Sequence, residues 1–330
     1  MARYIVLRFA YMIVVLLLVS IVAFLIINLP PGDFATAYLA TLSDTEAESS
    51  QALLASLRQQ YGLDRPLYIQ YAKWMYGILH GDFGLSFDWK QPVRNLIGER
   101  LALTVIISLS TLMITYALAI PIGIYSAFRQ YSILDYVFTV LGFVGLATPN
   151  FLLALVLMVF FLGYFGFSPG GLFSPQYLTA PWTGAKLVDF LKHLPVPLFV
   201  IGTHGTAGLI RVMRGTLLDE LRKQYVITAR AKGVSETRLL FKYPVRMALN
   251  PLVSTIGWLL PSIVSGAAIV EVVLGLPTTG PLLLRALLAQ DMYLAASMIM
   301  ILSFLTVIGT FLSDMLLVWL DPRIRFEKGA

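Results

Sequence analysis

Long apolar segments alternate with shorter polar stretches along most of this chain. Six of them contain few or no charged residues: 9–29, 101–128, 136–165, 195–210, 252–273 and 294–320. A helix needs about 20 apolar residues to cross a bilayer, and it satisfies its backbone hydrogen bonds internally, where no water is available. The pattern therefore predicts an all-α, polytopic membrane protein with six transmembrane helices.

Three of the apolar segments have features that affect this prediction. The first follows Arg3 and Arg8 but is too long for a typical signal peptide, so we expect a retained helix. The third contains Thr148-Pro149-Asn150 at its middle, and we expect one span because neighbouring helices can satisfy the freed carbonyl. The fourth is short and combines His204 with several glycines, which let helices approach closely in lipid.

The region 31–98 is polar and predicts a compact, mostly helical insert. Ser43-Asp-Thr-Glu46 fits a capping box that would start one helix. Asp64-Arg-Pro66 precedes an amphipathic stretch that ends near Gly81. Another amphipathic stretch lies near 182–194. The expected division is a first transmembrane helix, an insert, and a five-helix core with a polar loop: 1–30, 31–98, and 99–330 with the loop at 211–248.

Composition supports lipid as the solvent and excludes some partners. The chain is 58% hydrophobic and 13% charged, whereas soluble domains are about 25% charged. The net charge of +6 could suggest nucleic acid, but the charges lie between apolar segments and not on one face of a domain. We therefore expect a lipid bilayer as partner and no nucleic acid. The absence of cysteine excludes disulfides and thiolate metal sites.

Lysine and arginine indicate the orientation, because cytoplasmic loops carry an excess of both. The stretch 211–246 holds nine basic residues and only three acidic ones. Alternation of six spans places this loop and both termini in the cytoplasm and the insert outside. We expect a multi-pass protein of the inner (plasma) membrane.

No catalytic motif is visible. The sequence contains no GxxxxGK[ST], no HExxH and no GxSxG. Its three histidines, His80, His193 and His204, lack metal-ligand spacing. We therefore predict a non-catalytic protein without a cofactor or a metal.

A few polar residues in the apolar segments are candidates for a transport path. Asp135, Glu271 and Asp314 either face such a path or lie solvated at helix ends. His204 is either a pore-lining donor or a histidine bonded to a neighbouring helix. A proton-coupled transporter usually carries more intramembrane charges, arranged in pairs.

The stretch Tyr225-Val-Ile-Thr-Ala-Arg-Ala-Lys-Gly233 is the most distinctive part of the basic loop. Ala229 and Gly233 are four residues apart and would share one face of a helix. A nearly bare face with Arg230 and Lys232 beside it could enter a groove on another protein. The alternative is an ordinary basic cytoplasmic loop.

The order of residues in this stretch resembles the coupling-helix (EAA-type) loop of ABC importer permeases, in the peptide/nickel branch. The general pattern has Glu at Ile227 and Ala at Thr228, and a later Ile-x-Leu-Pro is replaced by Tyr243-Pro-Val-Arg246. These departures fit the peptide branch better than the sugar branch. Other segments resemble the B-type subunit of dipeptide/oligopeptide importers, in the same order: Leu29-Pro-Pro-Gly-Asp33, Tyr61-Gly-Leu-Asp-Arg-Pro66, Gly81-Asp-Phe-Gly-Leu-Ser86, Gln91-Pro-Val93, Glu271-Val-Val-Leu-Gly-Leu-Pro277 with Gly280, and Asp321-Pro-Arg-Ile-Arg325.

The resemblance implies a permease subunit that forms half of a translocation path. Its implied partners are a second, C-type permease, two ATP-binding subunits that hydrolyse ATP, and an extracytoplasmic solute-binding protein. The cargo would be peptides, with oligosaccharides, opines or nickel as alternatives, and a stand-alone secondary transporter or channel is the rival from another class. We expect His204 and Glu271 in the path. The residues expected to couple to the ATPases are Tyr225, Thr228, Ala229, Arg230, Ala231, Lys232 and Gly233.

Overall fold

A computed structural model describes residues 2–29, 32–39, 55–56, 58–59 and 62–320. The chain divides into two compact units, and each is described by itself. The N-terminal unit comprises residues 1–104 and 277–307, and the core unit comprises residues 105–276 and 308–330. Within the described ranges the fold is helical, as expected, with one isolated β-bridge between Leu85 and Pro92.

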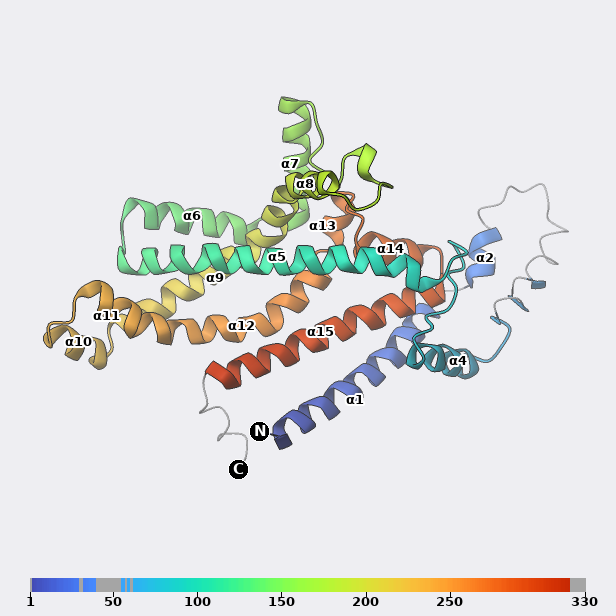
Figure 1. Cartoon of the computed structure of the whole chain (residues 1–330), viewed down its shortest axis with the longest axis horizontal. Helices are drawn as coiled ribbons and strands as arrows, with labels where there is room; N and C mark the ends of the chain where they lie inside the picture. Colours follow the sequence, from blue (N-terminus) through green and yellow to red (C-terminus); the bar gives the residue numbers. More distant parts are fainter. Residues whose placement is uncertain (1, 30–31, 40–54, 57, 60–61, 321–330) are drawn as a thin grey trace. The chain divides into compact units, whose positions relative to one another are not determined.

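The N-terminal unit joins the start of the chain to a segment close to its end (Figure 1). The expected amphipathic helix ending near Gly81 is confirmed as α4, whereas the capping box at 43–46 lies outside the described residues. The helices of this unit are α1 (Ala2–Ile27), α2 (Phe34–Leu39), α4 (Leu67–Leu79), the start of α5 (Val93–Phe128), α14 (Thr279–Leu288) and the first part of α15 (Met292–Leu320).

An aromatic cluster forms the core of this unit. Trp74 of α4 is 2% exposed and packs with Phe24 of α1, Phe34 of α2, Phe87 and Met292. Burying one large apolar side chain stabilises a fold by roughly 1.5–3 kcal/mol. The cluster therefore ties the polar insert to the two long apolar helices α1 and α15.

A buried carboxylate holds the loop that follows α4. Asp291 is fully buried directly before α15, and its Oδ2 accepts hydrogen bonds from Ser86 Oγ at 2.5 Å and from the Phe87 and Asp88 N–H groups at 2.8 and 3.2 Å. Its Oδ1 accepts from the Leu294 N–H at 3.2 Å and so caps α15. Burial raises the pKa of the Asp291 carboxyl, although these hydrogen bonds lower it in part.

The core unit is built around α9, which packs along α12 and α6. The amphipathic stretch expected near 182–194 is confirmed as α8. The helices of this unit are the remainder of α5, α6 (Ile133–Ala147), α7 (Asn150–Phe165), the short η2 (Pro175–Tyr177), α8 (Gly184–His193), α9 (Pro195–Leu221), α10 (Gln224–Ala231), α11 (Glu236–Lys242), α12 (Pro244–Gly266) and α13 (Ala268–Val273).

The prediction that residues 136–165 form one continuous helix is wrong. α6 and α7 meet at an angle of 104° across Thr148 and Pro149 (Figure 1). Thr148 is extended, with φ −88° and ψ 120°, because the proline ring disfavours helical geometry in the residue before it. Proline also lacks the N–H that would continue the helix. The pair is either a broken span or a re-entrant turn.

The expected count of six spans is not confirmed by length and composition among the described residues. Four described helices are long and apolar enough to cross a membrane, namely α1, α5, α9 and α15, or five if α6 and α7 form one span. The expected fourth span is longer than predicted, because α9 continues to Leu221. The expected fifth span begins earlier and is interrupted, because α12 ends at Gly266 and α13 starts at Ala268.

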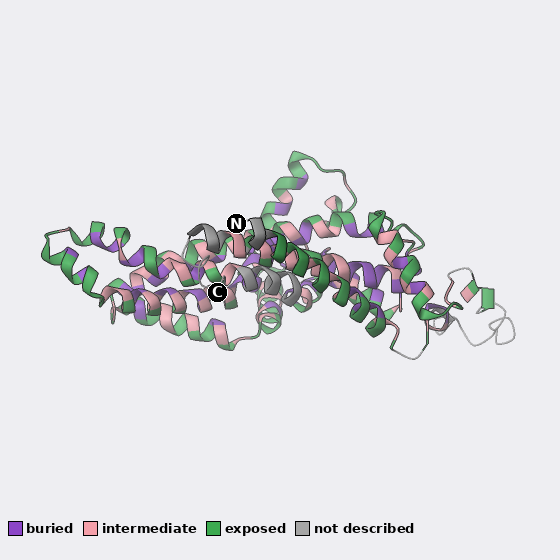
Figure 2. Cartoon of the chain, turned by 90° about the horizontal axis from the view of Figure 1, so that it is seen from below, coloured by how far each residue is buried: buried purple, intermediate pink, exposed green. Residues whose placement is uncertain are grey.

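Many large apolar side chains on these helices remain exposed in the single chain. Along α1, for example, Phe9, Leu17 and Leu25 are each about half exposed. Exposed residues, drawn in green, recur along the long helices in Figure 2. Exposed apolar surface of this extent is typical of lipid-facing helices or of subunit interfaces.

Candidate functional site

The polar segment between α9 and α12 forms a short helical hairpin. α9 runs without a break to Leu221, and α12 begins at Pro244, so the segment between them is 222–243, inside the expected 211–248. It contains α10 and α11, which we call the α10–α11 hairpin. Lys223 is extended and starts α10, and Ser235 is extended and starts α11.

A small apolar core holds the two helices of the hairpin together. Val226 and Ala229 of α10 and Leu239 of α11 are buried, with Val234 and Tyr243 packed partly against them. Val226 and Ala229 are three residues apart and therefore share one helix face. Ala229 is only 8% exposed, so it is a packing residue inside the hairpin and not part of an outer bare face.

Gly233 closes the hairpin by its backbone conformation. α10 ends at Ala231, and Gly233 has φ +76°, in the left-handed region that favours glycine. The Val234 N–H donates to the Ala229 carbonyl at 3.3 Å and the Gly233 N–H to the Arg230 carbonyl at 3.0 Å, which is a Schellman motif. The expectation that Ala229 and Gly233 share one helix face is therefore wrong, because the helix stops between them.

Side-chain hydrogen bonds hold the two ends of the hairpin in place. Arg230 donates from Nε to Glu236 Oε1 at 2.6 Å, and this interaction lowers the pKa of the Glu236 carboxyl. The Tyr225 hydroxyl donates to Glu220 near the end of α9. Partial burial, together with this carboxylate, raises the pKa of the Tyr225 hydroxyl. The hairpin is thus linked both to itself and to α9.

One side of α10 faces away from the hairpin core. Ile227 lies on this side and is 47% exposed, although it stands where the general motif has glutamate. Exposed residues appear on the hairpin at the left end of Figure 2. The exposed stripe consists of Gln224, Ile227, Thr228 and Ala231, at helical spacing. Of the seven expected coupling residues, six are exposed and Ala229 is buried: the exposed ones are Tyr225, Thr228, Arg230, Ala231, Lys232 and Gly233.

An ion pair between the buried Asp135 and the partly exposed Arg214 connects α9 to α6 a short distance before the hairpin. Asp135 is 2% exposed, and its carboxylate accepts from Nε and Nη2 of Arg214, both at 2.9 Å. The Tyr131 N–H donates to the same carboxylate at 2.9 Å. The interpretation of Asp135 as a solvated helix-end residue is therefore wrong. Sequence spacing could not show its partner, which is 79 residues away.

His204 lies where two cavities of the core unit meet. The cavities have volumes of about 330 and 360 Å³, and both are lined by Leu146, Asn150 and His204. Val270 of α13 lines the first, while its neighbour Glu271 is only 2% exposed and lines neither. The structure thus places one of the two expected path residues at a cavity and buries the other.

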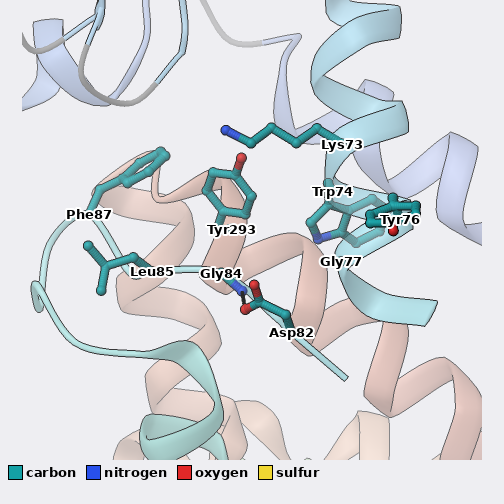
Figure 3. Close-up of a pocket in the computed structure, with 9 residues that line it drawn as sticks. All are labelled: Lys73, Trp74, Tyr76, Gly77, Asp82, Gly84, Leu85, Phe87 and Tyr293. Carbon is teal, nitrogen blue, oxygen red and sulfur yellow. Dashed lines mark hydrogen bonds between the residues drawn. The ribbon is translucent and has the colours of Figure 1, made fainter. Parts of the chain in front are cut away.

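The N-terminal unit has a pocket of its own, of about 400 Å³, beside α4. Figure 3 shows Lys73 and Tyr293 on one side of it and Asp82 and Gly84 on another. Asp82 Oδ1 accepts from the Gly84 N–H at 2.9 Å. A Cβ on Gly84 would lie 2.7 Å from the Tyr293 ring, so glycine allows this close packing. In the part of the chain that the structure describes, no group of three His, Cys, Asp or Glu residues could hold a metal ion.

Comparisons with known proteins agree with this architecture. Residues 119–326 match the family described as binding-protein-dependent transport system inner membrane component, and residues 1–110 match the corresponding N-terminal family. The oligopeptide transport system permease protein AppB of Bacillus subtilis is 36% identical over 99% of this chain and 100% of its own length. The oligopeptide transport system permease protein OppB of Haemophilus influenzae is 30% identical over 92% of this chain and 93% of its own.

A solved structure shows the same fold. An inward-facing structure of the MetNI methionine ABC transporter has a TM-score of 0.53 and 14% identity, covering 68% of this chain and 96% of that one. The helical architecture is that of a permease subunit of an ABC importer, a multi-pass protein of the inner membrane. The chain belongs to the family of binding-protein-dependent transport system inner membrane components.

Proposed function

We propose that this chain is a peptide importer subunit that forms half of a translocation path and receives mechanical force from ATPase subunits through the α10–α11 hairpin. Its partners are a second permease, two ATP-binding subunits in the cytoplasm and an extracytoplasmic solute-binding protein. Peptide cargo is supported by AppB and OppB, which are oligopeptide transport system permeases related over more than nine tenths of this chain. ATP hydrolysis belongs to the separate subunits.

The exposed stripe on α10 is the observation that supports docking. Ile227 and Ala231 are its apolar members, and Gln224 and Thr228 are its polar members. An ATPase groove that covers Ile227 would remove this apolar side chain from water. The basic content of the loop supports a cytoplasmic position for the hairpin, and thus for both chain termini. The insert, including α4, then lies outside.

The contacts around the hairpin explain how a push could reach the membrane helices. The hairpin is continuous with α9 at one end and with α12 at the other, and these two helices pack along each other. The bidentate Arg214–Asp135 pair ties α9 to α6. Because this pair joins the two helices by two hydrogen bonds, α6 follows α9 in small movements. Movement of the hairpin would tilt α9, α12 and α6 together and open the path, in an alternating-access cycle.

His204 and Glu271 have different roles in this proposal. His204 contacts the cargo, because it lines the two adjoining cavities. Glu271 supports the path wall from within, because it is buried in α13 beside the cavity-lining Val270.

The test replaces Ile227 in the complete importer, reconstituted in lipid vesicles with its ATPases and binding protein. Ile227→Lys places a long charged side chain on the exposed stripe and should reduce ATP-dependent peptide uptake at least about tenfold, which corresponds to about 1.4 kcal/mol. The matched control is Thr237→Lys, at an exposed position on α11 outside the stripe. Normal uptake by Ile227→Lys, with ATPase activity still stimulated by loaded binding protein, would show that the docking role is wrong.

A further inference from the structure

We propose that the cavity on the glycine-rich side of α9 is a cargo-contact site that binds the terminal carboxylate of a peptide through Arg211 and His204. This inference rests on the proposed importer function and adds a ligand group and its binding residues. The cavity has a volume of about 360 Å³, within the common range for small-ligand sites. It is large enough for the end of a peptide and too small for a whole oligopeptide.

Polar groups converge on this cavity from several helices. Thr115 of α5, Asn150 of α7 and Thr255 of α12 line it together with His204 and Arg211 of α9. Thr115 is 1% exposed, and its Oγ1 has no hydrogen-bond partner among the described residues.

Arg211 differs from the arginine that follows it one turn later. Arg214 is held by Asp135 in a bidentate ion pair. Among the residues that the structure describes, Arg211 has no such ion pair, although it lines the cavity and lies in an apolar helix of spanning length. Arg211 is exposed in the single chain, and charged side chains in such helices usually face a substrate or ion pathway. A guanidinium group pairs best with a planar carboxylate.

A second, apolar cavity on the opposite side of α9 provides a comparison within the same unit. A groove of about 780 Å³ between α5, α6 and α9 is lined almost entirely by apolar side chains, including Leu118, Phe138 and Phe199. That groove would accommodate an apolar group, such as a lipid acyl chain. The cavity at Arg211 combines a cation, an imidazole, an amide and hydroxyl groups, so it suits a polar, anionic group.

Glycines shape the cavity. Gly202 and Gly205 let α9 approach α5 and α12, since a Cβ on them would lie 3.2 Å from Thr115 Oγ1 and 3.4 Å from Leu259 respectively. Gly208 also lines the cavity, but a Cβ there would meet nothing within 4 Å. A larger side chain at position 208 can therefore project into the free space of the cavity without disturbing the packing. Gly215, two turns further on, has equally open surroundings and does not line the cavity.

The first experiment uses the absence of cysteine from the chain. Gly208→Cys and Gly215→Cys are each prepared in the complete importer, and their reaction with a small anionic thiol reagent is measured with and without peptide. We expect a free-acid peptide to slow labelling at position 208 at least about fivefold and to leave position 215 unchanged. The same peptide with an amidated C-terminus should protect position 208 much less. Equal protection by both peptides, or none, overturns the carboxylate assignment.

The second experiment separates this site from the importer function. Gly208→Leu should reduce ATP-dependent uptake at least about tenfold, whereas Gly215→Leu should transport like the unmodified protein. Arg211→Gln should remove the difference in protection between the acid and amide peptides. If the unmodified complex takes up no peptide, the proposed function fails. If it does, and Gly208→Leu and Arg211→Gln behave like it, only the site is refuted.

Arg211 could instead contact an anionic lipid headgroup, and the same variants distinguish this outcome. In that case Arg211→Gln would lower uptake of both peptides equally, and the loss would depend on the content of anionic lipid in the vesicles. That result would overturn the cargo-contact proposal.

Discussion

The loop after α4 (residues 80–92) and the α10–α11 hairpin are both polar segments between longer helices, and different contacts hold each in place. The loop is fixed from inside its unit, because the buried Asp291 accepts hydrogen bonds from Ser86 and from two backbone N–H groups of the loop. Phe87 of the same loop lies in the aromatic cluster around Trp74. The hairpin has an internal core of only three residues, a glycine turn and an exposed ion pair.

This difference has a functional meaning. A loop with an extensive core keeps its shape without help from a partner. A hairpin with a three-residue core keeps its apolar residue Ile227 outside, where another subunit can cover it. The carboxylates of the two segments also differ. Burial raises the pKa of Asp291, whereas the exposed Arg230 lowers the pKa of Glu236. Three changes test this contrast, beginning with the largest expected effect.

Trp74→Ala should destabilise the N-terminal unit most. Trp74 is 2% exposed in the aromatic cluster, and its Nε1 donates to Ser297 Oγ at 3.3 Å. Removing a buried tryptophan costs roughly 3–5 kcal/mol, through lost burial and the cavity left behind. Thermal unfolding of the purified complex and proteolysis of the insert measure the effect. Tyr68→Ala, on the same helix at a position 73% exposed, is the control and should change stability by less than about 0.5 kcal/mol.

Gly233→Val should loosen the hairpin by a smaller amount. The left-handed conformation at Gly233 costs an ordinary residue roughly 1–2 kcal/mol, and valine is β-branched. Gly233→Asn should have a clearly smaller effect, because asparagine tolerates this conformation. Amide hydrogen exchange over residues 224–242 measures the opening, and ATP-dependent uptake measures the consequence. Equal exchange in the two variants would mean that the turn geometry does not limit the hairpin.

Lowering the pH should produce the smallest effect, through Glu236. Its pKa is lowered by Arg230, so the ion pair contributes stability above the unfolded-state pKa of about 4.3 and loses it as the pH falls through the lower folded-state value. Both side chains are about half exposed, so solvent weakens the contribution. Hydrogen exchange of α11 should rise below about pH 4 relative to Glu236→Gln, in which this response is absent. A parallel rise in both proteins contradicts the assignment.

Several features could be predicted from local sequence because local physics decides them. The apolar stretches around α1, α5, α9 and α15 exceed the length that a membrane requires. α4 and α8 follow amphipathic spacing. The residue order at 225–233 identified the family, but the left-handed backbone of Gly233 was visible only in the structure. A helical spacing rule cannot show that the helix ends at Ala231.

What the sequence determined by itself is the solvent, the helical class and the position of the polar hairpin, since these depend on composition and on neighbours a few residues away. The tertiary structure decided which of those residues face outward. It buried Ala229 against Leu239, bent the chain at Pro149, paired Arg214 with Asp135 and left Arg211 at a cavity. These outcomes depend on contacts between residues distant along the chain, and one sequence contains no measure of which distant side chains meet.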